Sequence, residues 1–213
     1  MTTKKKILES AIDLFAAKGY TETTIRELAA AVGVKEASIY NHFPSKNAII
    51  EYILDEYSHF TRSAFEKDKL SIIKENPSAE GILSCMTLAF TEGKVEYYLK
   101  ELFVILQEQH RNPTVRKFVT EDYILGNEQT IIKMINDMKE LGMLRPETDP
   151  DFWAKMHSCI LYTFASRLKL GIGDSSPGYA GMGMTDMLLN MYDMLLKDFG
   201  TKKAVQQAAP GGG

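Results

Sequence analysis

The chain has 213 residues, of which 45% are hydrophobic and 25% are charged, a composition typical of an ordinary globular protein. Its longest apolar runs fall far short of the roughly 20 residues that span a bilayer, and no apolar signal core follows the basic start. These features exclude a membrane-spanning protein, and we expect a soluble cytoplasmic protein with no membrane partner. The length suffices for one small domain and a larger one.

The charge is unevenly distributed along the chain. A net charge of −3 is opposite in sign to the basic surface expected of a nucleic-acid binder. Residues 1–50, however, hold seven Lys or Arg and five Asp or Glu, a balance of +2 that leaves −5 for the other residues. The acidic character therefore lies away from the N-terminus. Cys85 and Cys159 form no metal-binding pair, and we predict buried, reduced thiols.

The first two predicted helices are short and amphipathic. Over residues 4–18 the apolar side chains recur at i, i+3, i+4 and i+7, and Gly19 supplies a stop. A second helix should begin at Thr24, because Thr24 and Glu27 have the spacing of a capping box. It should end at Gly33, since glycine best tolerates a left-handed turn.

Two further helices complete the N-terminal part. Residues 35–43 predict a third helix that Pro44 closes. Ser45 can cap a fourth helix whose apolar pattern continues toward Phe65. Beyond Pro77 the sequence predicts an all-α remainder with helices over 79–92, 95–110, 114–142, 150–170 and 182–199, a loop over 171–181 and a disordered tail over 201–213.

Residues 24–43 have the organisation of a helix-turn-helix, in which the second helix lies in the major groove and the first braces it. The outward side of the second helix carries groups that can bond to base edges or meet a thymine methyl: Lys35, Glu36, Ala37, Ser38 and Asn41. Three other side chains suit phosphates: Tyr40, His42 and Lys46. We therefore predict that this segment binds double-stranded DNA.

The segments Gly19-Tyr20, Thr23 to Ala29, Gly33-Val34 and Ser38 to Lys46 resemble the signature of the tetracycline-repressor (TetR) family of regulators. The resemblance covers about residues 4–56. It implies a DNA-binding domain over 1–46, a helical effector-binding and dimerisation domain over 47–200, and a tail over 201–213. It also implies that Thr24 and Arg26 touch DNA, that the chain is a homodimer on a palindromic operator, and that a small molecule is the effector.

The resemblance further implies that some aromatic and sulfur side chains of the second domain line an effector pocket, although such stripes usually form a core. The candidates are Phe90, Tyr97, Phe103, Gln107, His110, Tyr123, Met134, Trp153 and His157. For dimerisation the resemblance points to the last two helices, where an apolar face is expected from Met184, Met187, Leu188, Met191 and Leu195. An alternative for these methionines is an adaptable binding surface.

The sequence offers little support for an enzyme. It contains no nucleophile with a matched base, no metal cluster and no phosphate-binding glycine loop. His157 and Cys159 come nearest, but their i, i+2 spacing on a helix directs them to different faces. We expect no cofactor and no metal. The sequence thus favours a repressor released by a small, largely apolar effector; the alternative is a DNA-binding adaptor whose C-terminal domain binds a protein.

Overall fold

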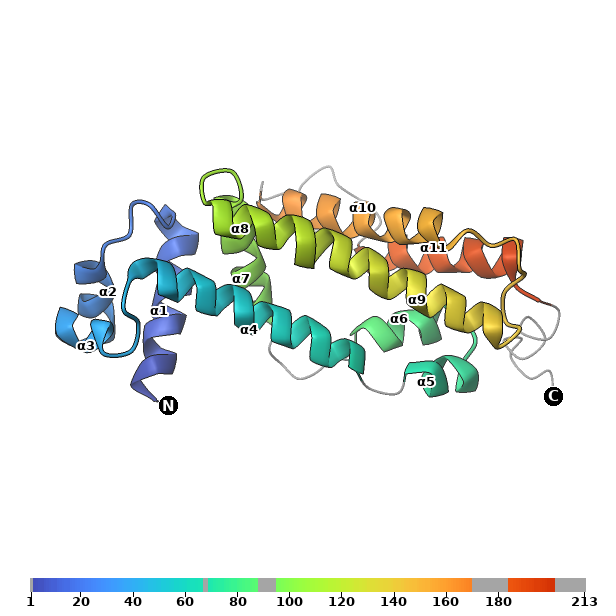
Figure 1. Ribbon diagram of the computed structural model, residues 1–213, viewed down its shortest axis with the longest axis horizontal. Helices are drawn as coiled ribbons and strands as arrows, with labels where there is room; N and C mark the ends of the chain where they lie inside the picture. The colour runs from blue at the N-terminus through green and yellow to red at the C-terminus, as the bar shows by residue number, and fades with distance from the viewer. Residues whose placement is uncertain (1, 67–68, 88–94, 170–183, 202–213) are drawn as a thin grey trace. The chain divides into compact units, whose positions relative to one another are not determined.

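The computed structural model describes residues 2–66, 69–87, 95–169 and 184–201. Every element in these ranges is helical, as expected for an all-α chain, apart from one isolated bridge between Leu144 and Gly200. The chain forms two compact units (Figure 1). Unit 1 comprises residues 1–60 and 93–121, and unit 2 comprises residues 61–92 and 122–213. The division thus falls inside the fourth helix, whereas the sequence places a domain boundary after residue 46.

Unit 1 begins with three helices that pack on one another: α1 (Thr3–Lys18), α2 (Ile25–Val32) and α3 (Glu36–Tyr40). The apolar face of α1 is buried, and Phe15 has no exposed surface. Across the turn, Leu28 of α2 and Ile39 of α3 are also buried. Burial of these side chains stabilises the three helices, since α3 is too short to form alone.

The ends of α2 confirm two predictions. The Thr24 hydroxyl accepts from the Glu27 amide (3.2 Å), and a Glu27 carboxylate oxygen accepts from the Thr24 amide (2.9 Å), which completes the capping box. At the other end Gly33 has φ 75°, a left-handed conformation that favours glycine. The third helix is shorter than the predicted 35–43, because the chain turns after Tyr40.

The remainder of unit 1 consists of the first part of α4 (Lys46–Glu66), α7 (Val95–Glu108) and α8 (Pro113–Phe118). As predicted, Ser45 caps α4, its hydroxyl accepting from the Ala48 amide at 3.0 Å. Asn112 caps α8 in the same way. Helix α7 packs along α1, so this unit contains more than the helix-turn-helix.

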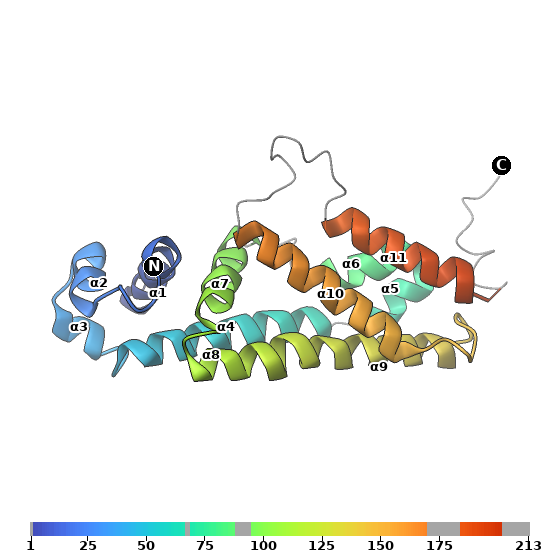
Figure 2. The ribbon, with the colours of Figure 1, turned by 90° about the horizontal axis from the view of Figure 1, so that it is seen from above.

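Unit 2 contains α5 (Lys69–Glu75), α6 (Ala79–Thr87), α9 (Asn127–Glu140), α10 (Pro150–Lys169) and α11 (Met184–Phe199). Helix α10 packs against both α9 and α11 (Figure 2). The core of unit 2 contains Trp153, Tyr192 and a set of Ile, Leu and Met side chains. The α9–α10 turn pairs with the end of α11, since the Arg145 amide donates to the Phe199 carbonyl at 2.8 Å.

Several elements differ from the sequence-based expectations. Helix α5 was not predicted at all. The helix predicted over 114–142 is interrupted by the π-helix η2 (Val119–Gly126), which lies between α8 and α9. Cys159 is exposed, so the prediction of a buried thiol is wrong for it. The side chain of Cys85, the loop over 171–181 and the tail from 202 onward lie outside the described residues.

The predicted apolar face of α11 is mostly used within the chain. Leu188, Met191 and Leu195 are 3%, 4% and 0% exposed and belong to the core of unit 2. The expected role of this face was a dimer interface or a core, and these three side chains are in the core. The exposed apolar side chains of α10 and α11 are instead Phe152, Met156 and Met194, which are 53%, 40% and 57% exposed.

Candidate nucleic-acid interface

The outward side of α3 and the turn after it carries most of the predicted DNA contacts. Lys35, Glu36, Ala37, Tyr40, Asn41 and His42 are exposed, whereas Ser38 is half-buried. Half of the surface of Tyr40 is accessible, which is unusual for a large aromatic side chain. The polar groups and the small Ala37 are therefore available to a DNA groove.

The opposite side of this segment fixes its position. Ile39 is fully buried and Phe43 is 3% exposed. The ring of Phe43 meets that of Tyr52 on α4 edge to face, with 5.7 Å between centroids. The inward side chains of this segment pack against α2 and α4. The outward side of α3 is therefore a rigid surface, which recognition of base edges requires.

Helix α2 contributes the other two predicted contacts. Arg26 is exposed one turn into the helix. Thr24 is exposed as well, but its hydroxyl is used by the capping box and also donates to Glu27 at 2.8 Å. Glu27 in turn pairs with Lys18 of α1, and this contact, more than its bonds to Thr24, lowers the pKa of its carboxyl to about 2. These contacts tie the start of α2 to α1.

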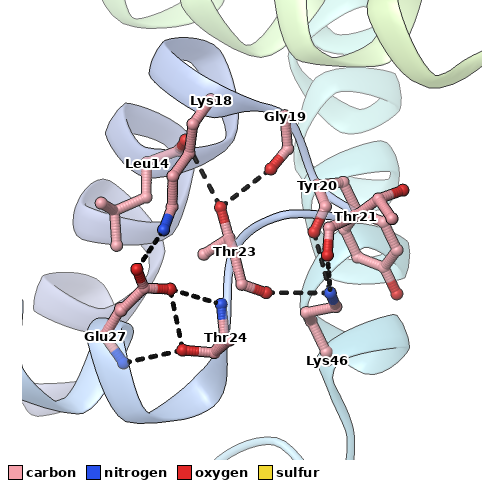
Figure 3. A network of polar contacts seen from close by, with 9 residues as sticks. All are labelled: Leu14, Lys18, Gly19, Tyr20, Thr21, Thr23, Thr24, Glu27 and Lys46. Atoms are coloured by element: carbon pink, nitrogen blue, oxygen red, sulfur yellow. Dashed lines mark hydrogen bonds and ion pairs between the residues drawn. The ribbon is translucent and has the colours of Figure 1, made fainter.

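Lys46 occupies a position that the sequence did not suggest (Figure 3). Its ammonium donates to three backbone carbonyls of the α1–α2 loop, those of Tyr20 (2.8 Å), Thr21 (3.2 Å) and Thr23 (2.9 Å). It also lies 4.4 Å from the centroid of the Tyr20 ring. Burial lowers the pKa of Lys46. An ammonium has three protons, and here each has an acceptor within the protein.

The same loop is held from the opposite side by α7. The Tyr20 amide donates to the buried carboxylate of Glu108 at 3.2 Å. Within the loop, the hydroxyl of the buried Thr23 donates to the Gly19 carbonyl at 2.9 Å. Sequence reasoning did not single out Glu108. The only available signal was its spacing of seven residues from Glu101, which places both carboxylates on one side of α7.

The predicted effector-pocket residues are divided between the two units. Tyr97, Phe103, Gln107 and His110 belong to unit 1; Tyr123, Met134, Trp153 and His157 belong to unit 2; and Phe90 lies outside the described residues. His110 is exposed, and Trp153 is packed in the unit 2 core. The Nδ1 atom of His157 lies 2.9 Å from the Tyr192 hydroxyl. Burial lowers the pKa of His157 to about 4.

Two kinds of feature are missing from the described residues. No helix there is both long and apolar enough to cross a membrane. Nor does that part of the chain bring three or more His, Cys, Asp or Glu side chains together in an arrangement that could hold a metal ion.

Comparison with known proteins places this geometry in context. Residues 7–53 match the family model for bacterial regulatory proteins of the tetR family. The chain is 27% identical over 169 residues, 79% of its length and 85% of the relative's, to the uncharacterized HTH-type transcriptional regulator YvkB of Bacillus subtilis. Over 48 residues it is 50% identical to IcaR of Staphylococcus aureus, a negative transcriptional regulator of a biofilm operon, covering 22% of this chain and 26% of that protein.

The fold extends the similarity beyond the N-terminal helices. The solved SmeT–triclosan complex superposes with a TM-score of 0.69 at 18% identity, covering 96% of this chain and 94% of that one. At that identity the likeness concerns the fold. The matched helix-turn-helix, the names of the relatives and the shared fold agree: residues 7–53 form a DNA-binding segment of the tetR family, and the proteins that this chain resembles are transcriptional regulators rather than enzymes.

Proposed function

We propose that the protein is a dimeric repressor that binds a palindromic operator through α3 and is released by a small, largely apolar effector. The observation that carries the DNA-binding part is the exposed, rigidly backed outward side of α3. The repressor role is supported by IcaR, which is named a negative regulator and is 50% identical to this chain over 48 residues. Such a protein would act in the cytoplasm, where its operator lies.

The proposed contacts keep the residues predicted from the sequence. Lys35, Glu36, Ala37, Ser38 and Asn41 would face base edges, and Tyr40 and His42 would meet phosphates. Thr24 and Arg26 would contact DNA from α2. Lys46 is the exception, because its three protons already have acceptors, and we assign it to the support of the loop instead.

Substitutions on α3 test this proposal. Lys35→Ala and Tyr40→Ala should each weaken operator binding by about 1 to 3 kcal/mol, since each removes one contact with DNA. Fluorescence anisotropy with the DNA flanking its own gene, at two salt concentrations, measures this effect. Lys117→Ala is the matched control, an exposed lysine on α8. Equal affinities for all four proteins would contradict the assignment of α3.

The homodimer is supported by an exposed stripe on α10. Phe152, Met156, Cys159 and Thr163 follow one another at spacings of three or four residues and are all exposed. On α11, Met194 is 57% exposed. Exposed apolar side chains that follow one face of a helix commonly mark a protein interface. A dimer is also what recognition of two half-sites about one DNA turn, roughly 34 Å, apart requires.

Charged substitutions in this stripe should therefore produce monomers. Phe152→Arg combined with Met194→Arg is expected to convert a dimer into a folded monomer, because two charges would have to be buried without partners. Sedimentation equilibrium measures the mass. Leu141→Arg, which also replaces an exposed apolar side chain of unit 2, serves as the control. A double variant that remained dimeric would place the interface elsewhere.

The effector is supported by the complex of the structurally similar SmeT with triclosan. A small apolar molecule that binds more tightly to the DNA-free form would release the operator by shifting the population. The alternative, an adaptor whose C-terminal domain binds a protein, predicts that no small molecule changes operator affinity. Anisotropy of the protein–operator complex during a titration with hydrophobic compounds distinguishes the two.

A further inference from the structure

A pocket of about 420 Å³ lies within unit 1, between the start of α1 and the neighbouring helices α4 and α7. Its volume is within the range of small-molecule sites. Its lining includes three tyrosines, Tyr52, Tyr97 and Tyr98, together with two glutamates, Glu9 and Glu56, and two lysines, Lys4 and Lys5. Tyr97 is the only one of these that the sequence suggested as a ligand contact.

The aromatic wall already accommodates a cation. The Lys4 ammonium lies 3.8 Å from the centroid of the Tyr52 ring and 5.5 Å from that of Phe43. A positive charge over the face of a tyrosine is attracted by the electron density of the ring. Lys4 is half-buried in the first turn of α1, and its ammonium is at the end of a long, flexible side chain, so another cation could take its place at Tyr52.

A buried carboxylate without a donor lies next to this wall. Glu101 has no exposed surface, and neither of its carboxylate oxygens has a hydrogen-bond donor within the described part of the chain. It follows Tyr97 by one turn on the same side of α7. The Tyr97 hydroxyl donates its single proton to Glu56 at 3.2 Å. The same hydroxyl is also near Glu101, but a single phenol proton cannot serve both carboxylates at once, so one of the two lacks a donor.

Buried carboxylate oxygens destabilise a protein unless a hydrogen-bond donor or a positive charge lies next to them. Burial, followed by the charge of Glu56, raises the pKa of Glu101 to about 8. An anion would be repelled by Glu9 and Glu56 and, above about pH 8, by Glu101 as well, and Lys5 already pairs with Glu9 at 3.9 Å. The groups around the pocket therefore match a positively charged ligand.

We propose that this pocket binds an organic cation, with Glu56 and Glu101 as its counter-ions and with Tyr52 and Tyr97 as its aromatic walls. The ligand replaces the Lys4 ammonium over Tyr52. The site lies in the unit that carries the helix-turn-helix, and it requires neither an operator nor a particular effector. Its existence is therefore independent of the proposed repressor function.

Calorimetric titration of the full-length protein in the absence of DNA tests the proposal. The probe is phenyltrimethylammonium, which keeps its charge at every pH, and benzenesulfonate and benzyl alcohol are the anionic and neutral comparisons. The cation is expected to bind, and both comparisons to bind at least about tenfold more weakly, because the carboxylates of Glu56 and Glu101 attract a positive charge and not a neutral or negative one. Equal binding of all three probes, or no binding of the cation, would overturn the proposal.

Single variants locate the site. At pH 9, where Glu101 is ionised, Glu101→Gln and Glu56→Gln should each weaken cation binding by about tenfold, since each removes a counter-ion at low dielectric. Lys4→Gln should instead strengthen it by about two- to fivefold, because the competing ammonium is gone. Glu140→Gln, which removes an exposed carboxylate of α9 in unit 2, should have no effect. If Glu101→Gln bound the cation as well as the wild type, the assignment would be wrong.

The pH dependence supplies a readout that a purely structural role would not change. Affinity for phenyltrimethylammonium should rise as the pH increases from about 6.5 to 9, because Glu101 ionises across that range. The other groups near it are Glu56 on α4, Tyr97 on α7, and Lys4, Lys5 and Glu9 on α1. The rise should disappear in Glu101→Gln and persist in Glu140→Gln. A rise of the same size in both would contradict the role of Glu101.

Discussion

Replacement of Lys46 by methionine is expected to lower the free energy of unfolding by about 3 kcal/mol. The ammonium donates to the carbonyls of Tyr20, Thr21 and Thr23, and hydrogen bonds to a charged group contribute about 1.5 to 3 kcal/mol each when they are well shielded. Because the site is only partly buried and the three bonds share one donor, we expect less than their sum. Urea unfolding followed by circular dichroism measures the loss.

Salt dependence distinguishes this supporting role from a phosphate contact. A lysine that neutralises a phosphate contributes about one to the slope of log affinity against log salt. We expect Lys46→Met to leave that slope unchanged and Lys35→Met to reduce it, with little effect of the latter on stability. Lys46→Arg should not restore stability, because a planar guanidinium cannot reproduce a tetrahedral set of three donors. A reduced slope with unchanged stability in Lys46→Met would return this residue to the DNA contacts.

The second large effect is a gain in stability from Glu101→Gln at alkaline pH. Because the pKa of Glu101 is raised from 4.5 to about 8 in the folded protein, the unfolded chain loses this proton first as the pH rises. The folded state is therefore destabilised progressively between pH 4.5 and 8. The total is on the order of 4 kcal/mol. Glu101→Gln, which stays neutral, should match the wild type near pH 4.5 and exceed it in stability by about that amount at pH 8.

The comparison must be made as a difference between the two proteins. Burial lowers the pKa of His157 to about 4, so stability also falls as the pH drops below about 6.5. This contribution is common to wild type and variant and cancels in the difference. Thermal unfolding of both proteins at several pH values gives the required curves, with Glu140→Gln as the exposed control. A constant difference across the range would show that Glu101 titrates normally.

Residues close together in the sequence were sufficient to predict the helix-turn-helix. The capping box of Thr24 and Glu27, the left-handed Gly33 and the cap at Ser45 depend on residues within a few positions of one another. The apolar spacing that predicted the inward side of α1 and α3 follows from helix geometry alone. For these reasons the sequence identified which side of α3 would be exposed before any tertiary contact was known.

Tertiary packing decided the points that the sequence missed. Lys46 lies in contact with Tyr20 although 26 positions separate them, and nothing in the local pattern indicates this. The buried position of Glu101 depends on how α7 packs in unit 1. Likewise Cys159 and Leu188 both lie on amphipathic helices, but only packing determines that the first is exposed and the second is in the core. From the sequence alone, the burial of Cys159 or Leu188 could therefore be expected only from how often such residues are buried in proteins.

The most direct test of the DNA-binding account is selection of DNA ligands from a random pool by the purified protein. We predict enrichment of an inverted repeat whose half-sites are centred about one helical turn apart, since two copies of α3 should read adjacent major grooves. Ala37→Glu, which places a negative charge on the exposed side of α3, should abolish that enrichment. Recovery of sequences without any shared motif by the wild-type protein would contradict sequence-specific recognition by α3.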